Sequence, residues 1–124
     1  MKSYYQYKKT DYKLPKPIYA KVVKTIAAYD YYQSVINGIK EKSENAVTDK
    51  DMAIKADAEH YIESIDRALE NWVIEPLQKP IFLHVARGIE YTALEDMCYV
   101  SASVLKRSVQ KFVYGVAKEL GEIF

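Results

Sequence analysis

Few residues in this chain have the types and spacing that catalysis or metal binding would require. His60 and Glu63 share one face of a predicted helix and resemble half of a metal site, but the only other histidine, His84, falls on a separate helix. A solvated helix face is the favoured interpretation of this pair. The lone Cys98 has no histidine near it in the sequence to activate a thiolate, so a buried thiol in a turn is expected.

The common sequence motifs of enzymes are also missing. The chain contains no glycine-rich loop that would cradle a phosphate and no Gly-x-Ser-x-Gly nucleophile motif. We therefore expect a protein that is not an enzyme and that binds neither a metal ion nor a cofactor.

Cationic residues, in contrast, gather near the C-terminus. From Ser101 to Lys118 no acid occurs, and the cations in this stretch are Lys106, Arg107, Lys111 and Lys118. A basic stretch of this kind fits a nucleic acid, an acidic protein or plain solvent.

The segment TALEDMCYVSASVLKRSVQKF has the layout of a helix-turn-helix, which needs a supporting helix, a tight link and a recognition helix. We expect Leu94 and Met97 to hold the supporting helix on the core, Val100 to plug the link and Ser101 to cap the recognition helix. The residues left on the outer side are Ser101, Ala102, Ser103, Lys106, Arg107 and Gln110.

Different roles are expected for these polar residues. Lys106 and Arg107 are the preferred candidates for DNA contact, and Arg107 is the better base reader because its planar guanidinium can grip guanine in two places. Lys111 lies further along the helix, where a phosphate contact is favoured. Ser101 and Ser103 could bind a phosphate or a base, although a capping serine without a DNA role explains them nearly as well. Two ordinary helices of a bundle with a solvated basic face would also produce this pattern.

The periodicity of apolar residues predicts an all-α fold, a small bundle of about five helices. We expect helices over residues 17–38, 49–72, 80–88, 91–97 and 101–121, with a loop over 40–47 and a link at 98–100. Thr48 is the predicted cap of the second helix. Pro76 and Pro80 are expected to break the helical pattern after Trp72, and the short piece that begins at Pro80 is expected to face inward with Ile81 and Val85, with Leu77 as a further candidate. Three regions follow: a basic Tyr/Lys-rich arm at 1–16, a two-helix scaffold at 17–75, and a helix-turn-helix DNA-binding region at 76–124.

Charge and composition add to this interpretation. The net charge of the 124 residues is only +1, yet the first 24 residues contain seven lysines and a single acid, Asp11. The lysines and Tyr4, Tyr5, Tyr7 and Tyr12 of the arm could follow a DNA backbone or stack on bases, although a solubilising tail is the simpler explanation. Neither an apolar leader nor a run long enough to span a membrane is present, so an intracellular protein is expected.

From Leu14 to Gly121 the chain resembles the RinA-type late transcriptional regulators of phages that infect Gram-positive bacteria. The resemblance is carried by KLPKPIYAKVVKTIAAYDYYQ, by DKDMAIKADAEHYIESIDRALE and, most specifically, by LKRSVQKFVYGVAKELG. It places the KR pair of the family motif on Lys106 and Arg107 and the following lysine on Lys111. Val104 and Leu105 stand where the family would have Thr-Trp, and Ser108 where an aromatic is common, so the target sequence does not carry over.

The resemblance implies a helix-turn-helix like the promoter-reading part of sigma factors and a phage or prophage protein that activates late genes. Its expected partners are double-stranded DNA and host RNA polymerase. A homo-oligomer is also expected, with the first helix and Tyr29, Tyr31 and Tyr32 on the association surface. The expected location is the cytoplasm of the bacterial host. The alternatives are a packaging-recognition protein, like a small terminase subunit, that binds phage DNA, and a protein-interaction adaptor whose basic helix meets an acidic protein.

Overall fold

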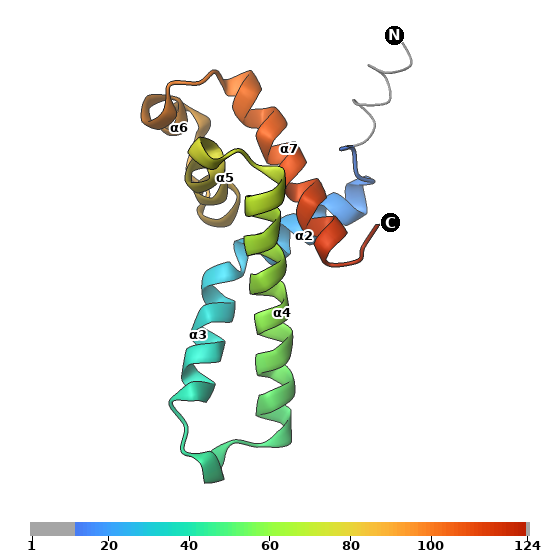
Figure 1. The fold of residues 1–124 in the computed structure, drawn as a ribbon, viewed down its shortest axis with the longest axis vertical. Helices are drawn as coiled ribbons and strands as arrows, with labels where there is room; N and C mark the ends of the chain where they lie inside the picture. The colour runs from blue at the N-terminus through green and yellow to red at the C-terminus, as the bar shows by residue number, and fades with distance from the viewer. Residues whose placement is uncertain (1–11, 124) are drawn as a thin grey trace.

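The computed structural model describes residues 12–123, and within them the chain is almost entirely helical. Residues 12–123 form six α-helices and one short 3-10 helix and contain no strand, which confirms the expected all-α bundle. The elements are α2 (Lys16–Ala27), α3 (Tyr29–Lys40), η1 (Glu44–Ala46), α4 (Asp49–Trp72), α5 (Glu75–Arg87), α6 (Tyr91–Cys98) and α7 (Ala102–Glu119). In Figure 1, α3 and the first part of α4 run side by side away from the other helices, and η1 lies in the loop at the far end of this hairpin; the last part of α4 packs against α7.

The helix expected over residues 17–38 is in fact two helices, α2 and α3, because the chain bends at Ala28. The apolar spacing runs through the bend, so no pattern in the sequence indicates it. Packing against different neighbours explains the break: Val22 and Ile26 of α2 are buried in the core, whereas α3 packs along α4. Beyond the bend, Arg87 of α5 donates two hydrogen bonds to the carboxylate of Asp30, which ties α3 to α5.

The second predicted helix is confirmed as α4, over the expected residues. The Thr48 hydroxyl accepts a hydrogen bond from the Asp51 N–H at 3.0 Å, and the Asp51 carboxylate accepts one from the Thr48 N–H at 3.1 Å. This capping box satisfies two backbone donors at the start of the helix. The Lys42 Nζ lies 2.8 Å from the Asp51 carboxylate. The hydrogen bond from Lys42, together with the one from the Thr48 backbone, lowers the pKa of the Asp51 carboxyl.

The third predicted helix begins five residues earlier than expected, at Glu75 instead of Pro80. Pro76 lies in its first turn, where a proline costs no helical hydrogen bond, and Pro80 is accommodated inside the helix. Leu77 is buried, so the helical start places one more apolar side chain in the core. Gly88 ends the helix in the left-handed conformation, with φ of 72°, as predicted.

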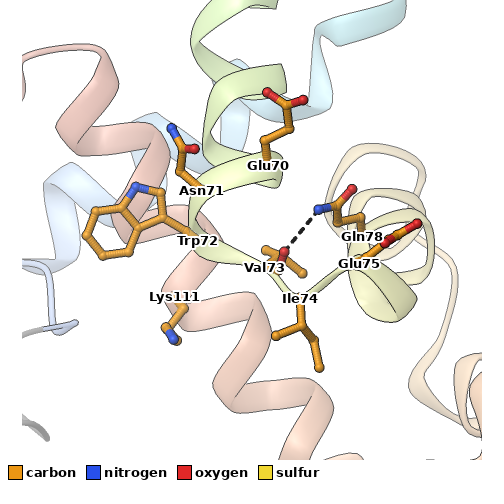
Figure 2. A pocket seen from close by; sticks show the side chains of 8 residues that line it. All are labelled: Glu70, Asn71, Trp72, Val73, Ile74, Glu75, Gln78 and Lys111. Carbon is orange, nitrogen blue, oxygen red and sulfur yellow. Dashed lines mark hydrogen bonds between the residues drawn. The ribbon is translucent and has the colours of Figure 1, made fainter.

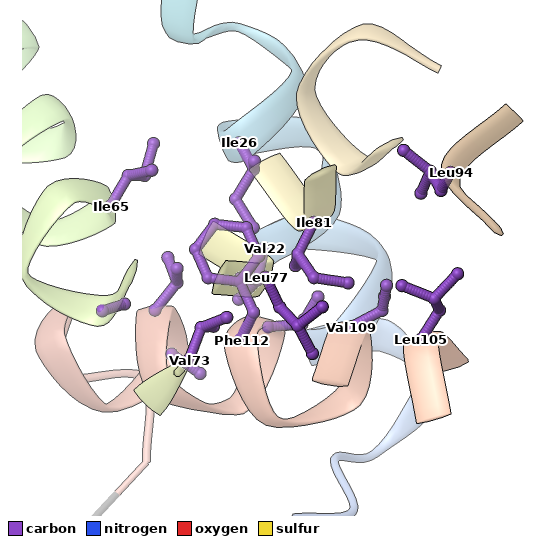
Figure 3. Close-up of a cluster of buried hydrophobic side chains, with 14 residues drawn as sticks. Val22, Ile26, Ile65, Val73, Leu77, Ile81, Leu94, Leu105, Val109 and Phe112 are labelled. Atoms are coloured by element: carbon purple, nitrogen blue, oxygen red, sulfur yellow. The ribbon is translucent and has the colours of Figure 1, made fainter. Parts of the chain in front are cut away.

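One hydrophobic core joins the helices, and α7 contributes most to it (Figure 3). Its buried residues are Leu105, Val109, Phe112, Val113, Gly115, Val116 and Ala117. They pack against Val22 and Ile26 of α2, Ile65 of α4 and Ile81 of α5. The scaffold expected at 17–75 and the DNA-binding region expected at 76–124 therefore share this core.

Candidate nucleic-acid interface

The link between α6 and α7 is short and tight. Residues 99–101 connect the two helices, and Tyr99 takes the left-handed conformation with φ of 56° that ends α6. A glycine is the usual residue at such a position, since a side chain there is strained. Cys98, expected in the link, is instead the last residue of α6, and its thiol donates a hydrogen bond to the Leu94 carbonyl. The thiol is half-buried and held inside the helix.

The expected cap of α7 is confirmed. The Ser101 hydroxyl accepts from the Val104 N–H at 3.5 Å, and the Ser101 and Ser103 hydroxyls lie 3.1 Å apart. Both serines are exposed, and Ala102 between them is half-buried. The start of α7 thus presents small polar groups, and it carries no acid in its first turn.

The two sides of α7 separate as the periodicity predicted. Leu105, Val109 and Phe112 are buried, while the three cations expected to face outward are exposed. We call Lys106, Arg107 and Lys111 the cationic face of α7. Gln110, also expected on the outer side, is half-buried.

The cations of this face are not neutralised by carboxylates of the described residues. None of the ion pairs formed within residues 12–123 includes Lys106, Arg107 or Lys111. The two lysines lie over aromatic rings instead: Lys106 Nζ is 5.7 Å from the Tyr91 ring centroid, and Lys111 Nζ is 5.4 Å from that of Tyr12. Such contacts orient a cation without cancelling its charge.

The ring beneath Lys106 is itself held between helices. Tyr91 stacks on His84 of α5 with ring centroids 4.1 Å apart, and burial raises the pKa of its phenol above the ordinary value. The phenol therefore stays neutral at pH 7 and leaves the charge of Lys106 intact. This support was not anticipated from the sequence, because the residues involved come from three different helices.

The supporting helix is attached to the core less extensively than predicted. Leu94 is fully buried as expected, and Val100 is half-buried against the core. Met97, however, is 50% exposed. It lies in the last turn of α6, and Leu94 one turn earlier is the residue that fills the core.

A mixed groove borders the cationic face on one side (Figure 2). It lies between the end of α4, the start of α5 and Lys111 of α7, and Trp72 lies on the same side of it as Lys111. Two acids, Glu70 and Glu75, also line it. Because carboxylates repel phosphates, this groove marks the edge of the surface that a nucleic acid could occupy.

The rejected metal and catalytic candidates stay apart in the structure. His60 lies on α4 and His84 on α5, where the latter stacks on Tyr91. Within residues 12–123 no three His, Cys, Asp or Glu side chains are arranged to hold a metal ion. None of the helices described is long and apolar enough to cross a bilayer.

Comparison with protein families, with curated proteins and with solved structures found no match to this chain.

Proposed function

We propose that this protein is a phage or prophage DNA-binding regulator that activates late genes through the helix-turn-helix formed by α6 and α7. The observation that supports the proposal best is the cationic face of α7, whose three cations are exposed and unpaired with carboxylates of the described chain. The mechanism is recruitment: α7 enters a major groove and another surface contacts host RNA polymerase.

The dimensions of α7 suit this role. Ser103 to Lys111 spans eight residue steps, or about 12 Å of helix, which is about the width of the major groove. In this arrangement Lys106 and Arg107 approach base edges and Lys111 meets a phosphate at the rim. The Ser101 cap adds backbone N–H groups at the start of the helix that favour a second phosphate. The later turns of α7 carry the core residues and stay packed in the protein.

A binding experiment with selected DNA tests the proposal. Duplexes enriched from a random pool by the protein are labelled, and their affinity is measured by fluorescence anisotropy over a series of salt concentrations. We expect saturable binding that prefers the selected sequence and weakens steeply with salt, because phosphate contacts release counterions. Equal affinity for selected and scrambled duplexes at every salt concentration would contradict sequence reading, and no binding at low salt would contradict a DNA role altogether.

We also propose that the protein acts as a homo-oligomer through the α3–α4 hairpin. An open groove there, the tyrosine groove, is formed by Tyr31, Tyr32, Val35, Ile54, Asp57, Ala58 and Tyr61. Tyr31 is 66% exposed beside it, and Ile54 is 41% exposed. A protruding ring next to a groove on the same surface suits a two-fold contact, in which each copy inserts its ring into the other.

Tyr29, which was expected on this surface, faces inward instead. Its hydroxyl donates to the Asp66 carboxylate at 3.0 Å, and its ring meets Phe82 edge-on with centroids 4.9 Å apart. Burial and the Asp66 contact raise the pKa of Tyr29 to about 12. Tyr29 therefore links α3 to α4 and α5.

Sedimentation equilibrium tests the association surface. Tyr31→Glu is expected to shift the chain towards the monomer by at least about tenfold in dissociation constant, since a buried unpaired charge opposes association. Met52→Glu is the control, because Met52 is 62% exposed and lines a different groove of the hairpin. A monomeric wild-type chain, or equal effects of the two substitutions, would contradict the assignment.

A further inference from the structure

The side chain of Tyr99, in the link between α6 and α7, is not used by the fold. The residue is 92% exposed. Within residues 12–123 its hydroxyl forms no hydrogen bond and its ring lies against no other ring. Its backbone, in contrast, is fixed: the Tyr99 N–H donates to the Glu95 carbonyl at 2.9 Å, and the next residue, Val100, packs against the core. The fold therefore sets the place from which this side chain projects and leaves the side chain itself without a partner.

A tyrosine at this position is also strained. Tyr99 is the only residue other than glycine with a positive φ in the described part of the chain, at 56°. A side chain in this left-handed conformation crowds its own backbone, and the two other left-handed residues of residues 12–123 are glycines, Gly88 and Gly121. No contact of the exposed side chain offsets the strain. Strained residues of this kind cluster where a protein meets a ligand.

Tyr99 adjoins the surface that we assign to DNA. The link lies at the end of the molecule opposite the tip of the α3–α4 hairpin (Figure 1). Tyr99 precedes the Ser101 cap by two residues, a span of at most about 7 Å. Phosphates of one DNA strand follow each other every 3.4 Å or so along the helix axis. A phosphate held at the cap therefore brings its neighbours on the same strand close to Tyr99, and the first turn of α7 contains no acid to repel them.

We propose that Tyr99 is a further DNA-contacting residue, whose phenol hydroxyl donates a hydrogen bond to a backbone phosphate near the one at the Ser101 cap. The inference rests on the proposed function and gives a role to a side chain that the α7 contacts leave unused. Met97, 50% exposed, and the exposed Asp96 would instead suit a protein with a basic, partly apolar surface. DNA is the favoured partner, because a hydroxyl donor matches a phosphate acceptor and the cationic face of α7 follows directly.

Loss of the hydroxyl alone tests this contact in the full-length chain. Tyr99→Phe is expected to lower the affinity for the selected duplex about tenfold, the effect of one hydrogen bond to a charged group. The slope of log affinity against log salt should stay the same because no charge is removed, and so should the preference for the selected sequence. Tyr19→Phe is the matched control: Tyr19 lies on α2 and is 38% exposed, and this variant should bind like wild type.

Tyr99→Gly separates the strain from the contact. Its melting temperature is expected to rise by about 2 to 5 °C, because glycine adopts this backbone conformation freely, while its affinity for the selected duplex falls at least as much as that of Tyr99→Phe. A residue with a purely structural role would show only the change in stability. Phosphates of the duplex are then replaced one at a time by neutral methylphosphonates. One position should weaken binding of the wild-type chain and have little further effect on Tyr99→Phe.

Three results would count against these assignments. Wild-type affinity of both Tyr99 variants would overturn the inference, leave the α7 site in place and favour a protein partner at this turn. Loss of affinity in Tyr99→Gly but not in Tyr99→Phe would also overturn it, since the ring and not the hydroxyl would then make the contact. Absence of any DNA binding by the wild-type chain would overturn the proposed function itself.

Discussion

Replacing Gly115 with alanine is expected to destabilise the fold by about 2 to 3 kcal/mol, although alanine is the better helix former by about 1 kcal/mol. A Cβ atom at position 115 would lie 2.4 Å from both Cγ and Cδ1 of Trp72. This is far inside van der Waals contact, so either the indole or the helix must move. The indole is held in turn by the rings of Tyr12 and Tyr114, which leaves it little freedom to rotate.

Gly38→Ala provides the matched control for that substitution. Gly38 lies in α3, and a Cβ built on it meets nothing within 4 Å. The same chemical change there is expected to stabilise the protein by about 0.5 to 1 kcal/mol, because the unfolded chain loses freedom. Urea denaturation followed by circular dichroism measures both free energies of unfolding. Equal effects of the two substitutions would show that α7 and Trp72 do not approach each other this closely.

Features with a local sequence signal were predicted well. The start of α4 was predicted from Thr48 as its cap, and the structure adds that Asp51, three residues later, completes a capping box with it. The two sides of α7 were also predicted, since a helix with this much apolar periodicity can bury only one face. The exposure of Lys106 and Arg107 follows from the same periodicity.

The errors arise where packing between distant segments decides the outcome. The bend at Ala28 depends on what lies against α2 and α3, and the early start of α5 depends on the burial of Leu77. At both places, packing between distant segments overrides the local preference of the sequence, which favours a continuous helix through Ala28 and a later start of α5. Tyr29 was placed on the surface for the same reason, because its partners Asp66 and Phe82 are far from it in the chain.

The aromatic rings beneath the two lysines were missed on similar grounds. Tyr91 supports Lys106 and Tyr12 supports Lys111, but no spacing rule connects residues on separate segments. The number of tyrosines, twelve in 124 residues, was a partial signal of these contacts, because so many rings cannot all be fully buried in the core.

The low net charge conceals the cationic face because the acids lie elsewhere. Glu119, at the end of α7, pairs with Arg67 at 3.0 Å, and Glu122 pairs with Lys21 at 2.7 Å. These carboxylates are thereby engaged at the opposite end of α7 from Ser101. The net charge of the whole chain is therefore close to zero, while the first two turns of α7 carry positive side chains and no acid.

The double variant Lys106→Ala/Arg107→Ala is expected to lower the affinity for the selected duplex by about 100-fold. A base contact by Arg107 contributes about 1 to 3 kcal/mol of discrimination, and the loss of two cations should also make the salt slope shallower by about 2. The protein should remain folded, because both side chains are exposed and Lys106 loses only its contact with Tyr91, worth about 0.5 to 1 kcal/mol. Anisotropy titrations and thermal unfolding of the same samples measure the two effects.

Two further variants separate charge from geometry at this site. Arg107→Lys keeps the charge and removes the planar fork, so it should retain the salt slope and lose preference for the selected sequence. Lys40→Ala/Lys50→Ala removes two exposed cations from the α3–α4 hairpin loop region and should change neither property. If the double variant at 106 and 107 bound DNA as tightly as this control, α7 would not be the DNA-reading helix. A recognition helix that loses both of its exposed cations near the N-terminus must lose affinity for DNA.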